Sequence, residues 1–376
     1  MTGSMTVPPD IVCAFDYERH AKANLPKPLW AYIAGAGGDG LTKKRNRQAF
    51  DGLELNSRVL ADMTGATTAT TLLGLPLSLP IILAPVAHQR LVHPDGELAT
   101  ALASRACATW MTISTLSSVA IEEIAAQSQT TVLFQLYMQQ ERADTLSLVR
   151  RAEAAGCKAI MVTVDAAVAG VRNDEHRAGF RLPPHVRPVN VDGKRQPTST
   201  AGPGESPVFK GLLDRAPTWK DIEWLRAQTA LPILLKGIVN PADAARAVEA
   251  GVDGLVVSNH GGRTLDTLPS SLDALVAVAA SVNGRVPLLL DGGIRRGTDV
   301  LKALALGASA VMIGQPIMHA LAVAGAVGVI HLLTILRAEL EIAMALTGCA
   351  RVTDIDRRVI WNGGGLAVRS PAASAI

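Results

Sequence analysis

The chain has 376 residues, of which 48% are apolar and 18% are charged, and its formal net charge is +3. This composition excludes a disordered or fibrous protein and supplies enough apolar side chains for one large domain or two ordinary ones. Lys and Arg are scattered along the chain instead of forming a basic stripe, so we expect no binding to nucleic acid.

The cysteine pattern indicates the cellular compartment in which the protein works. Four cysteines lie far apart without a CxxC pair, and no apolar signal segment follows Met1. We therefore expect reduced thiols in a cytoplasmic protein, mostly structural, with a catalytic thiol as the alternative. No grouping of His, Cys and Asp has metal-ligand spacing, so we expect no metal.

The first eighty residues read as a helical extension that precedes the main domain. Within it, "GAGGDG" at 35–40 resembles a phosphate-binding loop. This glycine cluster follows a helical stretch and not a strand, however, so we interpret it as a turn.

Eight short apolar runs follow, each bounded by turn residues. They are continuous rather than alternating, as in strands that are buried on both faces. Stretches with helical periodicity separate them, several with Pro at the start or Gly just past the end. The runs span residues 81–86, 110–115, 131–137, 159–165, 232–238, 254–260, 286–293 and 310–316.

Alternating strands and helices predict a parallel sheet. A closed (β/α)8 barrel (a TIM barrel) over about 81–347 is the economical arrangement, with a doubly wound open sheet as the alternative. We expect one domain over 1–376, with a long polar loop after the fourth strand whose part at about 183–215 is mobile. Residues 317–336 lack charge and are long enough to span a bilayer, but we interpret them as a helix packed on the core.

Polar side chains gather where the predicted strands end, which is the active-site rim of such barrels. Six strands contribute to this rim. The residues concerned are Gln135, Tyr137, Thr163, Asp165, Lys236, Ser258, Asn259, His260, Asp291 and Gln315.

Two adjacent turns on this rim suit a phosphate. "DGGIRRG" brings backbone N–H groups close to an anion, and Arg295 or Arg296 can bind it with a bidentate pair of hydrogen bonds; "IGQP" supplies the neighbouring turn. In "VSNHGGRTLD", His260 suits a general base with Asp165 as its partner, and Arg263 suits a substrate carboxylate. Lys236 is open to two interpretations, a Schiff-base nucleophile or a fixed positive charge.

At these residues the chain resembles the FMN-dependent 2-hydroxy acid oxidases and dehydrogenases, which include glycolate oxidase, lactate oxidase and mandelate dehydrogenase. The motifs "LLKGI", "VSNHGGRTLD", "LLLDGGIRRGTDVLKALALGA" and "LTGC" carry the resemblance, which runs from about residue 25 to about residue 360. It implies oxidation of an (S)-2-hydroxy acid to a 2-keto acid, a bound FMN and a homotetramer.

The resemblance also implies roles for individual residues. His260 would be the base, Asp165 would stabilise its protonated form, and Lys236 would be a fixed cation near the flavin. The substrate would be held by Tyr32, Tyr137, Arg172 and Arg263. FMN would contact Ala87, Ser114, Gln135, Thr163, Lys236 and Ser258, and its phosphate would lie on Asp291, Gly292, Gly293, Arg295, Gly314 and Gln315.

Several positions depart from the pattern of these relatives. Gln315 replaces the usual arginine beside the phosphate glycine, so we expect weaker FMN retention, and His88 replaces a typical methionine near the flavin. Leu116 and Ala169 are smaller than their counterparts in glycolate oxidase, which favours an aromatic substrate such as mandelate or 4-hydroxymandelate. Lactate- or glycolate-type substrates are the alternative.

The loop after the fourth strand bears on the electron acceptor. Membrane-docking mandelate dehydrogenases carry an apolar insertion there, whereas this loop is polar. The difference favours a soluble enzyme that does not bind a membrane and passes electrons to oxygen, giving hydrogen peroxide; a soluble dehydrogenase with another acceptor is the alternative. Whether the base takes the α-proton or the hydroxyl proton stays open.

Two rival classes share part of this pattern. Other FMN barrels, of the isopentenyl diphosphate isomerase or inosine-phosphate dehydrogenase type, share the phosphate turns but lack the His260 and Arg263 pair. A flavin-binding scaffold with a dead site has no reason to keep His260, Arg263, Arg172, Tyr137 and Asp165 together.

Overall fold

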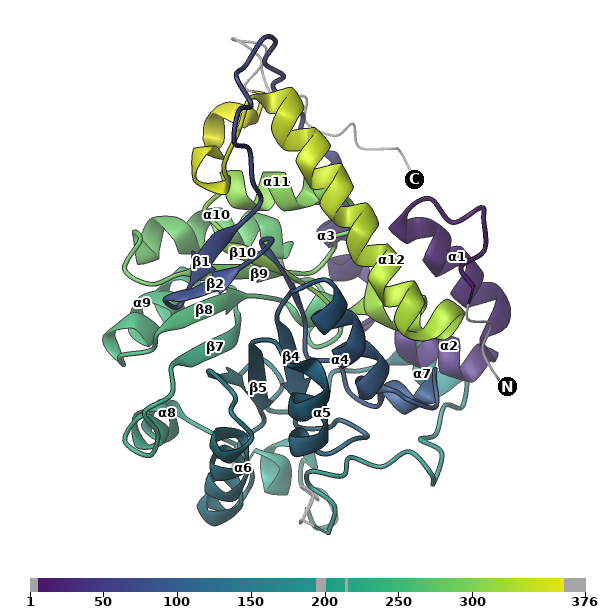
Figure 1. Cartoon of the computed structure of the whole chain (residues 1–376). Helices are drawn as coiled ribbons and strands as arrows, with labels where there is room; N and C mark the ends of the chain where they lie inside the picture. Colours follow the sequence, from purple (N-terminus) through teal and green to yellow (C-terminus); the bar gives the residue numbers. More distant parts are fainter. Residues whose placement is uncertain (1–5, 194–200, 214–215, 362–376) are drawn as a thin grey trace, which may run out of the picture.

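The computed structural model describes residues 6–193, 201–213 and 216–361. Eight parallel strands close into a barrel in the order β10-β3-β4-β5-β6-β7-β8-β9 (Figure 1). The predicted barrel is therefore confirmed, and the open sheet is excluded. The strands are β3 (Ile81–Leu83), β4 (Met111–Ser114), β5 (Val132–Leu136), β6 (Ile160–Thr163), β7 (Ile233–Ile238), β8 (Gly254–Val257), β9 (Leu288–Asp291) and β10 (Ala310–Ile313).

Helices follow the strands and cover the outside of the barrel, as Figure 1 shows. Asn240 and Ser270 cap two of them by accepting backbone N–H bonds through their side chains. The covering helices are α4 (Glu97–Ala106), α5 (Ile121–Ser128), α6 (Arg142–Ala154), α8 (Trp219–Arg226), α9 (Pro241–Glu249), α10 (Ser271–Val282), α11 (Gly297–Ala305) and α12 (Gln315–Thr347).

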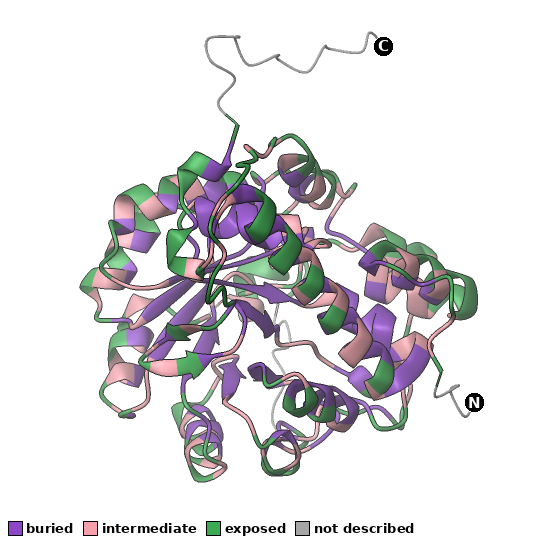
Figure 2. Cartoon of the chain, turned by 45° about the horizontal axis from the view of Figure 1, so that its top comes forward, coloured by how far each residue is buried: buried purple, intermediate pink, exposed green. Residues whose placement is uncertain are grey.

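The core has two parts because each strand is buried on both faces, as the buried strands in Figure 2 show. One cluster lies between the strands and the helices and includes Ile81, Ile113 and Phe134. The other cluster fills the barrel with side chains such as Met161 and Leu289. A hairpin of β1 (Thr70–Leu72) and β2 (Leu75–Leu77) packs on this inner cluster.

The strand register brings the polar strand ends level with one another. Ser114 pairs with Gln135 on the neighbouring strand, and Thr163 pairs with Lys236. Parallel strands in register expose their carboxyl ends on one rim. The side chains expected at the site therefore start from the same end of the barrel.

The N-terminal extension consists of α1 (Ala14–Asn24), α2 (Lys27–Ala34) and α3 (Leu41–Asp51). Between α2 and α3, the "GAGGDG" segment is a turn, as predicted, and Gly37 donates its backbone N–H to Gly262 O at 2.7 Å. A Cβ at Gly37 would lie 2.6 Å from Thr264 O, so only glycine allows this approach. The turn thus ties the extension to the loop that carries His260.

Helix α12 contains the apolar segment 317–336. By length and composition it is the one helix in the described residues that could cross a bilayer, and just over half of its most apolar window is buried. It breaks at Ala324 and Gly325 and packs against α1, α4 and α11, as the sequence interpretation expects. Glycine suits this break, because Gly325 has a left-handed φ of +57° and a Cβ there would lie 2.7 Å from His93 Nε2.

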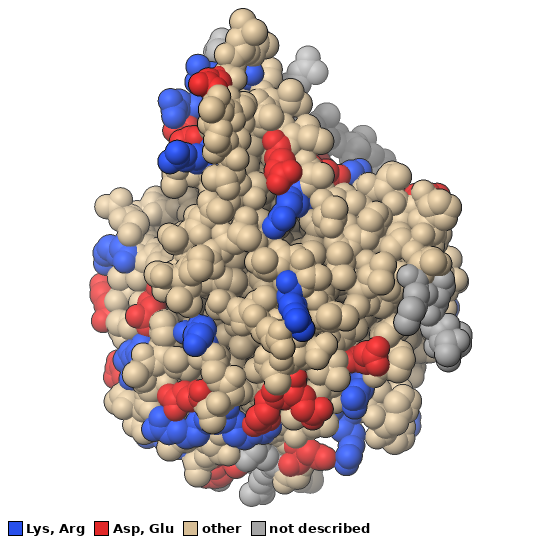
Figure 3. Space-filling model, viewed as in Figure 1, with Lys and Arg blue, Asp and Glu red and all other residues tan. Residues whose placement is uncertain are grey.

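The connection after β6 is the long one, as predicted, and it contains the short helix α7 (Asn173–Arg177). Part of the segment at 183–215 lies outside the described residues, and its mobility stays a prediction. On the face shown in Figure 3, acidic and basic side chains are interspersed and form no continuous basic stripe.

Candidate active site

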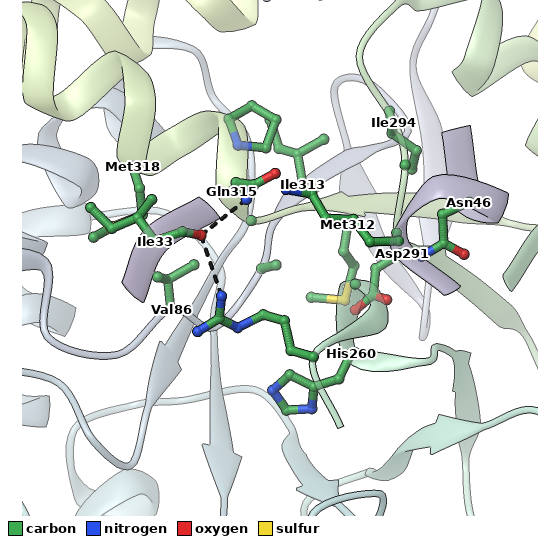
Figure 4. A pocket seen from close by; sticks show the side chains of 18 of the residues that line it. Ile33, Asn46, Val86, His260, Asp291, Ile294, Met312, Ile313, Gln315 and Met318 are labelled. Atoms are coloured by element: carbon green, nitrogen blue, oxygen red, sulfur yellow. Dashed lines mark hydrogen bonds between the residues drawn. The ribbon is translucent and has the colours of Figure 1, made fainter. Parts of the chain in front are cut away.

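A cavity of about 660 Å³ opens at the carboxyl ends of the barrel strands. Figure 4 shows part of its lining, in which His260, Asp291 and Gln315 surround the same space. The lining brings together most of the residues singled out in the sequence: Tyr32, Ala87, Ser114, Gln135, Tyr137, Thr163, Arg172, Lys236, His260, Arg263, Asp291, Gly292, Gly293, Arg295, Gly314 and Gln315.

Two expected site residues do not line the cavity themselves but contact residues that do. Asp165 contacts His260, and Ser258 is fully buried. The Ser258 hydroxyl accepts hydrogen bonds from Lys236 Nζ at 3.0 Å and from the backbone N–H of His260 at 2.9 Å. The side chain of Ser258 therefore positions two cavity residues, and its expected contact with FMN stays a prediction.

His260 and Asp165, the expected base and its carboxylate, are in contact. His260 Nδ1 lies 2.9 Å from Asp165 Oδ1, and the backbone of His260 is left-handed with φ +57°. A non-glycine residue in this conformation is uncommon and costs free energy. The turn thus holds His260 in a strained backbone conformation in which its imidazole lines the cavity and contacts Asp165.

Asp165 is held in its ionised form. Burial alone would raise the pKa of Asp165, but the hydrogen bond from His260 and the charges of His260 and Lys236 outweigh it, so the pKa is lowered. An ionised Asp165 accepts the proton on His260 Nδ1 and leaves Nε2 as the ring nitrogen that can accept a proton. This pair has the electrostatics of a general base.

The two candidate carboxylate-binding arginines share a counter-ion. Arg172 Nη1 donates to Glu175 Oε1 at 2.6 Å, and Arg263 Nη2 lies 3.4 Å from the same oxygen. Burial, together with repulsion from Arg172, lowers the pKa of Arg263. One carboxylate oxygen can therefore bridge both guanidinium groups at this point. Glu175 was not expected at the site from the sequence, in which its one signal is the spacing three residues after Arg172.

The two tyrosines complete this end of the cavity. Tyr32 stacks on Phe180 with ring centroids 4.4 Å apart, and Arg263 lies over the Tyr32 ring at 5.5 Å. Tyr137 follows β5 and is anchored by its backbone N–H, which donates to Thr115 Oγ1. Burial raises the pKa of Tyr137 to about 12, so its hydroxyl stays protonated and can donate a hydrogen bond.

Lys236 is a fixed cation in the floor of the cavity. Its Nζ lies 2.8 Å from Asp291 Oδ2, and its side chain is 5% exposed. Burial alone would lower the pKa of Lys236, but the charges of Asp291 and Asp165 raise it. A protonated amine is not a nucleophile, so the electrostatics favour the fixed charge over the Schiff base.

Several buried polar atoms of the site have no partner in the part of the chain that the structure describes. They are Gln135 Nε2, Asp165 Oδ2, Arg172 Nε and Asp291 Oδ1. Buried polar atoms in proteins are normally hydrogen-bonded. A cavity with unpaired donors and acceptors around a fixed cation fits a planar polar cofactor such as FMN, which presents carbonyl, ring-nitrogen and ribityl hydroxyl groups.

The phosphate end of the cavity is built from two turns. Gly292 and Gly293 adopt φ of +93° and +87°, and a Cβ at Gly293 would lie 2.5 Å from Asn46 O. Arg295 lines the cavity, whereas Arg296 turns away and pairs with Glu339 at 2.7 Å. Of the two arginines left open by the sequence, Arg295 is therefore the one that faces the cavity, and its contact with a phosphate stays a prediction.

Gln315 links this end of the cavity to the substrate end. Its Oε1 accepts from Arg295 Nη2 at 2.5 Å, and its Nε2 donates to Ile33 O at 2.9 Å. Figure 4 shows the bond between Gln315 and Ile33, and the same Ile33 carbonyl also accepts from Arg263 Nη1 at 3.3 Å. One backbone oxygen thus connects the phosphate turn to a candidate substrate ligand.

His88 does not line this cavity in the structure. Its backbone is left-handed with φ +55°, its side chain is buried, and burial lowers the pKa of the ring. Its backbone N–H donates to Leu116 O at 3.1 Å. The expected closeness of His88 to the flavin therefore stays a prediction.

A buried amide pair that the sequence did not reveal holds the loop that carries His260. Asn46 and Asn259 exchange two hydrogen bonds of 2.8 and 2.7 Å, which join α3 to the loop carrying His260. Asn46 Oδ1 also accepts from the backbone of Ser271, and Asn259 Oδ1 from that of Gly262. Only the polarity of Asn259 at a strand end gave a signal.

A cavity at the mouth of a closed parallel barrel that brings together a buried cation, an imidazole and two arginines is the arrangement expected of a flavin oxidoreductase. The family model for FMN-dependent dehydrogenases matches residues 21–362. The chain therefore belongs to this family, whose members use FMN and oxidise CH–OH groups.

The similar proteins are oxidases. The chain is 46% identical to an L-lactate oxidase of Nostoc sp., covering 91% of this chain and 96% of that protein. It is 42% identical to glycolate oxidase 1 of Oryza sativa subsp. indica, with 94% and 96% covered. Among solved structures, mandelate oxidase with (S)-2-phenylpropionate matches with a TM-score of 0.85 and 44% identity, covering 93% of this chain and 98% of that one.

Proposed function

We propose that this enzyme oxidises an (S)-2-hydroxy acid with an aromatic side chain, such as mandelate or 4-hydroxymandelate, to the 2-keto acid, with oxygen as acceptor and hydrogen peroxide as product. The observation that carries this proposal is the His260–Asp165 pair in one cavity with Arg172 and Arg263. A base and two guanidinium groups match the hydroxyl-bearing carbon and the carboxylate of such an acid.

Each group of residues has a separate role in the proposed reaction. Arg172 and Arg263 bind the substrate carboxylate in place of Glu175, and Tyr32 and Tyr137 donate hydrogen bonds to the substrate. His260 Nε2 takes a proton from the substrate, and Asp165 stabilises the resulting imidazolium across the 2.9 Å contact. When bound, FMN supplies the two-electron acceptor. Lys236 contributes a positive charge beside it, and Ala87, Ser114, Gln135, Thr163 and Ser258 hold its ring.

The proposed preference for an aromatic side chain rests on the space that the small side chain at position 116 leaves in the cavity. Leu116 lines the cavity, and the similar solved structures include mandelate oxidase with benzoyl-formic acid. A lactate- or glycolate-type substrate is the second candidate, because curated relatives at 46% and 42% identity are an L-lactate oxidase and a glycolate oxidase.

The proposal of oxygen as the electron acceptor rests on the same relatives, both of which are oxidases by name. A cytoplasmic homotetramer stays our expectation from the sequence.

Anaerobic flavin bleaching tests the proposal. The purified holoenzyme is mixed with (S)-mandelate, (S)-4-hydroxymandelate, (S)-lactate and glycolate, and the loss of flavin absorbance is followed by stopped flow. We expect mandelates to reduce the flavin fastest and readmitted oxygen to restore the colour with formation of peroxide. Faster reduction by lactate or glycolate would select the second candidate, and reduced flavin that persists in oxygen would select a dehydrogenase.

A further inference from the structure

Lys43 lies at the phosphate end of the cavity and was not expected there from the sequence. It is partly buried in the first turn of α3 and lines the cavity together with Gly293 and Arg295. Asn46, three residues further along α3, packs closely on the phosphate turn, because a Cβ at Gly293 would lie 3.2 Å from the Cβ of Asn46. Residues three apart share one face of a helix, so Lys43 lies on the face of α3 that meets this turn.

The amine of Lys43 has no acidic partner among the described residues. Its Nζ donates to Ala34 O at 2.5 Å and forms no salt bridge in that part of the chain. Burial and the charge of Arg295 lower the pKa of Lys43, although the charge of Glu18 opposes them. An ammonium group has three N–H donors, so two of them remain available for a ligand.

Positive charge exceeds negative charge at this end of the cavity. Arg47 also lines it, but two carboxylates at 2.6 and 2.8 Å neutralise that guanidinium. Glu18 lies 3.6 Å from Arg295 Nε, and Asp291, the other acid in the described lining, is already paired at 2.8 Å. Lys43 is thus left as a partly buried cation without a counter-ion.

The imidazole of His319 responds to the same surplus of charge. His319 is fully buried on α12, and both of its ring nitrogens lack a hydrogen-bond partner in the part of the chain that the structure describes. Burial, followed by the charges of Arg295 and Lys43, holds the pKa of His319 well below its ordinary value. The ring is therefore neutral, and the two cations act on one small region beside the phosphate turn.

We propose that Lys43 binds the phosphate of FMN and supplies the second positive charge that Gln315 does not provide. Its amine and the amide of Gln315 bind consecutive backbone carbonyls, those of Ala34 and Ile33, so both groups are anchored at the same end of α2. A lysine is a point charge without the bidentate fork of an arginine, so it offsets the loss at position 315 only in part. The inference rests on the expected position of the phosphate beside Gly293.

A comparison of FMN with riboflavin tests the inference. Riboflavin has the same ring and ribityl chain but no phosphate, so a residue that binds the phosphate affects the binding of FMN alone. The apoprotein of Lys43→Gln is titrated with each flavin, and Kd is measured by quenching of flavin fluorescence. We expect the Kd of FMN to rise about tenfold, as for the loss of one charge-assisted hydrogen bond, and the Kd of riboflavin to stay within about twofold of the wild type. An unchanged Kd of FMN, or an equal loss for both flavins, would overturn the inference.

Two further variants locate the charge. Lys43→Arg keeps the positive charge and should bind FMN far better than Lys43→Gln does. Arg45→Gln is the matched control, because Arg45 lies on the same helix, is exposed, donates to Leu268 O at 3.2 Å and does not line the cavity. We expect it to change the Kd of neither flavin. Loss of FMN binding in Arg45→Gln as large as in Lys43→Gln would show that only the net charge of α3 matters and would overturn the inference.

Arg295→Gln separates the role of Lys43 from the position of the phosphate. If the phosphate lies at this end, Arg295→Gln should also weaken the binding of FMN and spare that of riboflavin. An equal effect on both flavins would place the phosphate elsewhere, and the inference would fall with it. A selective loss in Arg295→Gln without one in Lys43→Gln would refute the role of Lys43 alone. None of these titrations contains a 2-hydroxy acid, so their outcome is independent of the proposed substrate.

Discussion

Arg295 Nη2 donates a hydrogen bond to Gln315 Oε1 at 2.5 Å, so the arginine that faces the phosphate site is already engaged by a neutral neighbour. The side chain of Arg295 is 11% exposed, and partial burial lowers its pKa despite the charge of Glu18 nearby. A phosphate must therefore compete with Gln315 for this donor and receives no second positive charge from position 315. The arrangement supports the weaker FMN retention expected from the sequence.

Gln315→Arg should tighten FMN binding. A second charge-assisted contact with the phosphate is worth about 1.5 to 3 kcal/mol, so we expect the Kd of FMN for the apoprotein to fall by roughly tenfold to a hundredfold. The Kd is measured by quenching of flavin fluorescence during titration with apoprotein.

Gln315→Leu is the control for this change. It also removes the bond to Arg295 but adds no charge, and it breaks the hydrogen bond to Ile33 O. We expect FMN to bind no more tightly to this variant than to the wild type. An unchanged Kd in Gln315→Arg, or equal tightening in both variants, would show that charge at this position does not limit retention.

Asp165→Asn should impair proton transfer and leave FMN binding intact. The amide cannot stabilise an imidazolium and can present its N–H to Nδ1, which inverts the tautomer of His260. We expect kcat/KM to fall by about 10² to 10⁴, with the Kd of FMN within twofold of the wild type.

The pH dependence of this loss follows from the direction of the pKa shift. The pKa of Asp165 in the folded protein lies below its ordinary value, so the carboxylate is ionised at every pH above that value, and its contribution is lost only as the pH falls through the lower folded pKa. The ratio of wild-type to variant kcat/KM should therefore stay well above unity between pH 6 and pH 9. A ratio that approaches unity within this window would contradict the assignment.

Glu175→Gln should strengthen substrate binding. Glu175 Oε1 lies 2.6 Å from Arg172 and 3.4 Å from Arg263, where the substrate carboxylate is proposed to bind. Without this internal anion, Arg172 Nη1 and Arg263 Nη2 are free for the substrate carboxylate, while Arg263 Nη1 keeps its bonds to two backbone carbonyls. We therefore expect KM to fall several-fold while kcat changes little. The variant should also melt at a lower temperature in the absence of substrate, because two buried like charges then lack a counter-ion.

Asp174→Asn is the matched control for this prediction. Asp174 lies on the same short helix, but it pairs with the exposed Arg177 at 3.4 Å. Exposed pairs of this kind contribute little, so KM and the melting temperature should stay close to the wild-type values. A raised KM in Glu175→Gln would show that Glu175 positions the arginines for the substrate instead of competing with it.

The barrel could be predicted from the sequence because its strands are continuous apolar runs, and each polar strand end marks the catalytic rim. His260, Lys236 and Asp291 were found in this way, since strand position alone places them. Glu175 could not be predicted from strand positions, because it lies in a long connection and its role depends on the direction in which its side chain points. The Ile33 carbonyl and the Asn46–Asn259 pair could not be found either, because they join the N-terminal helices to the barrel across more than two hundred residues.

Gly237→Ala should disturb the base through its carboxylate. Gly237 has φ +111°, and a Cβ there would lie 2.5 Å from Asp165 Cβ and Cγ, so alanine must displace Asp165, which contacts His260. Gly251→Ala is the matched control, because Gly251 also has a positive φ, +75°, but open space around its Cβ position. Each substitution carries a backbone strain of about 1 to 3 kcal/mol, so both variants should lose stability to urea. Only Gly237→Ala should lose at least tenfold in the rate of flavin reduction; equal rates in the two variants would mean that contact between Asp165 and His260 does not limit the reaction.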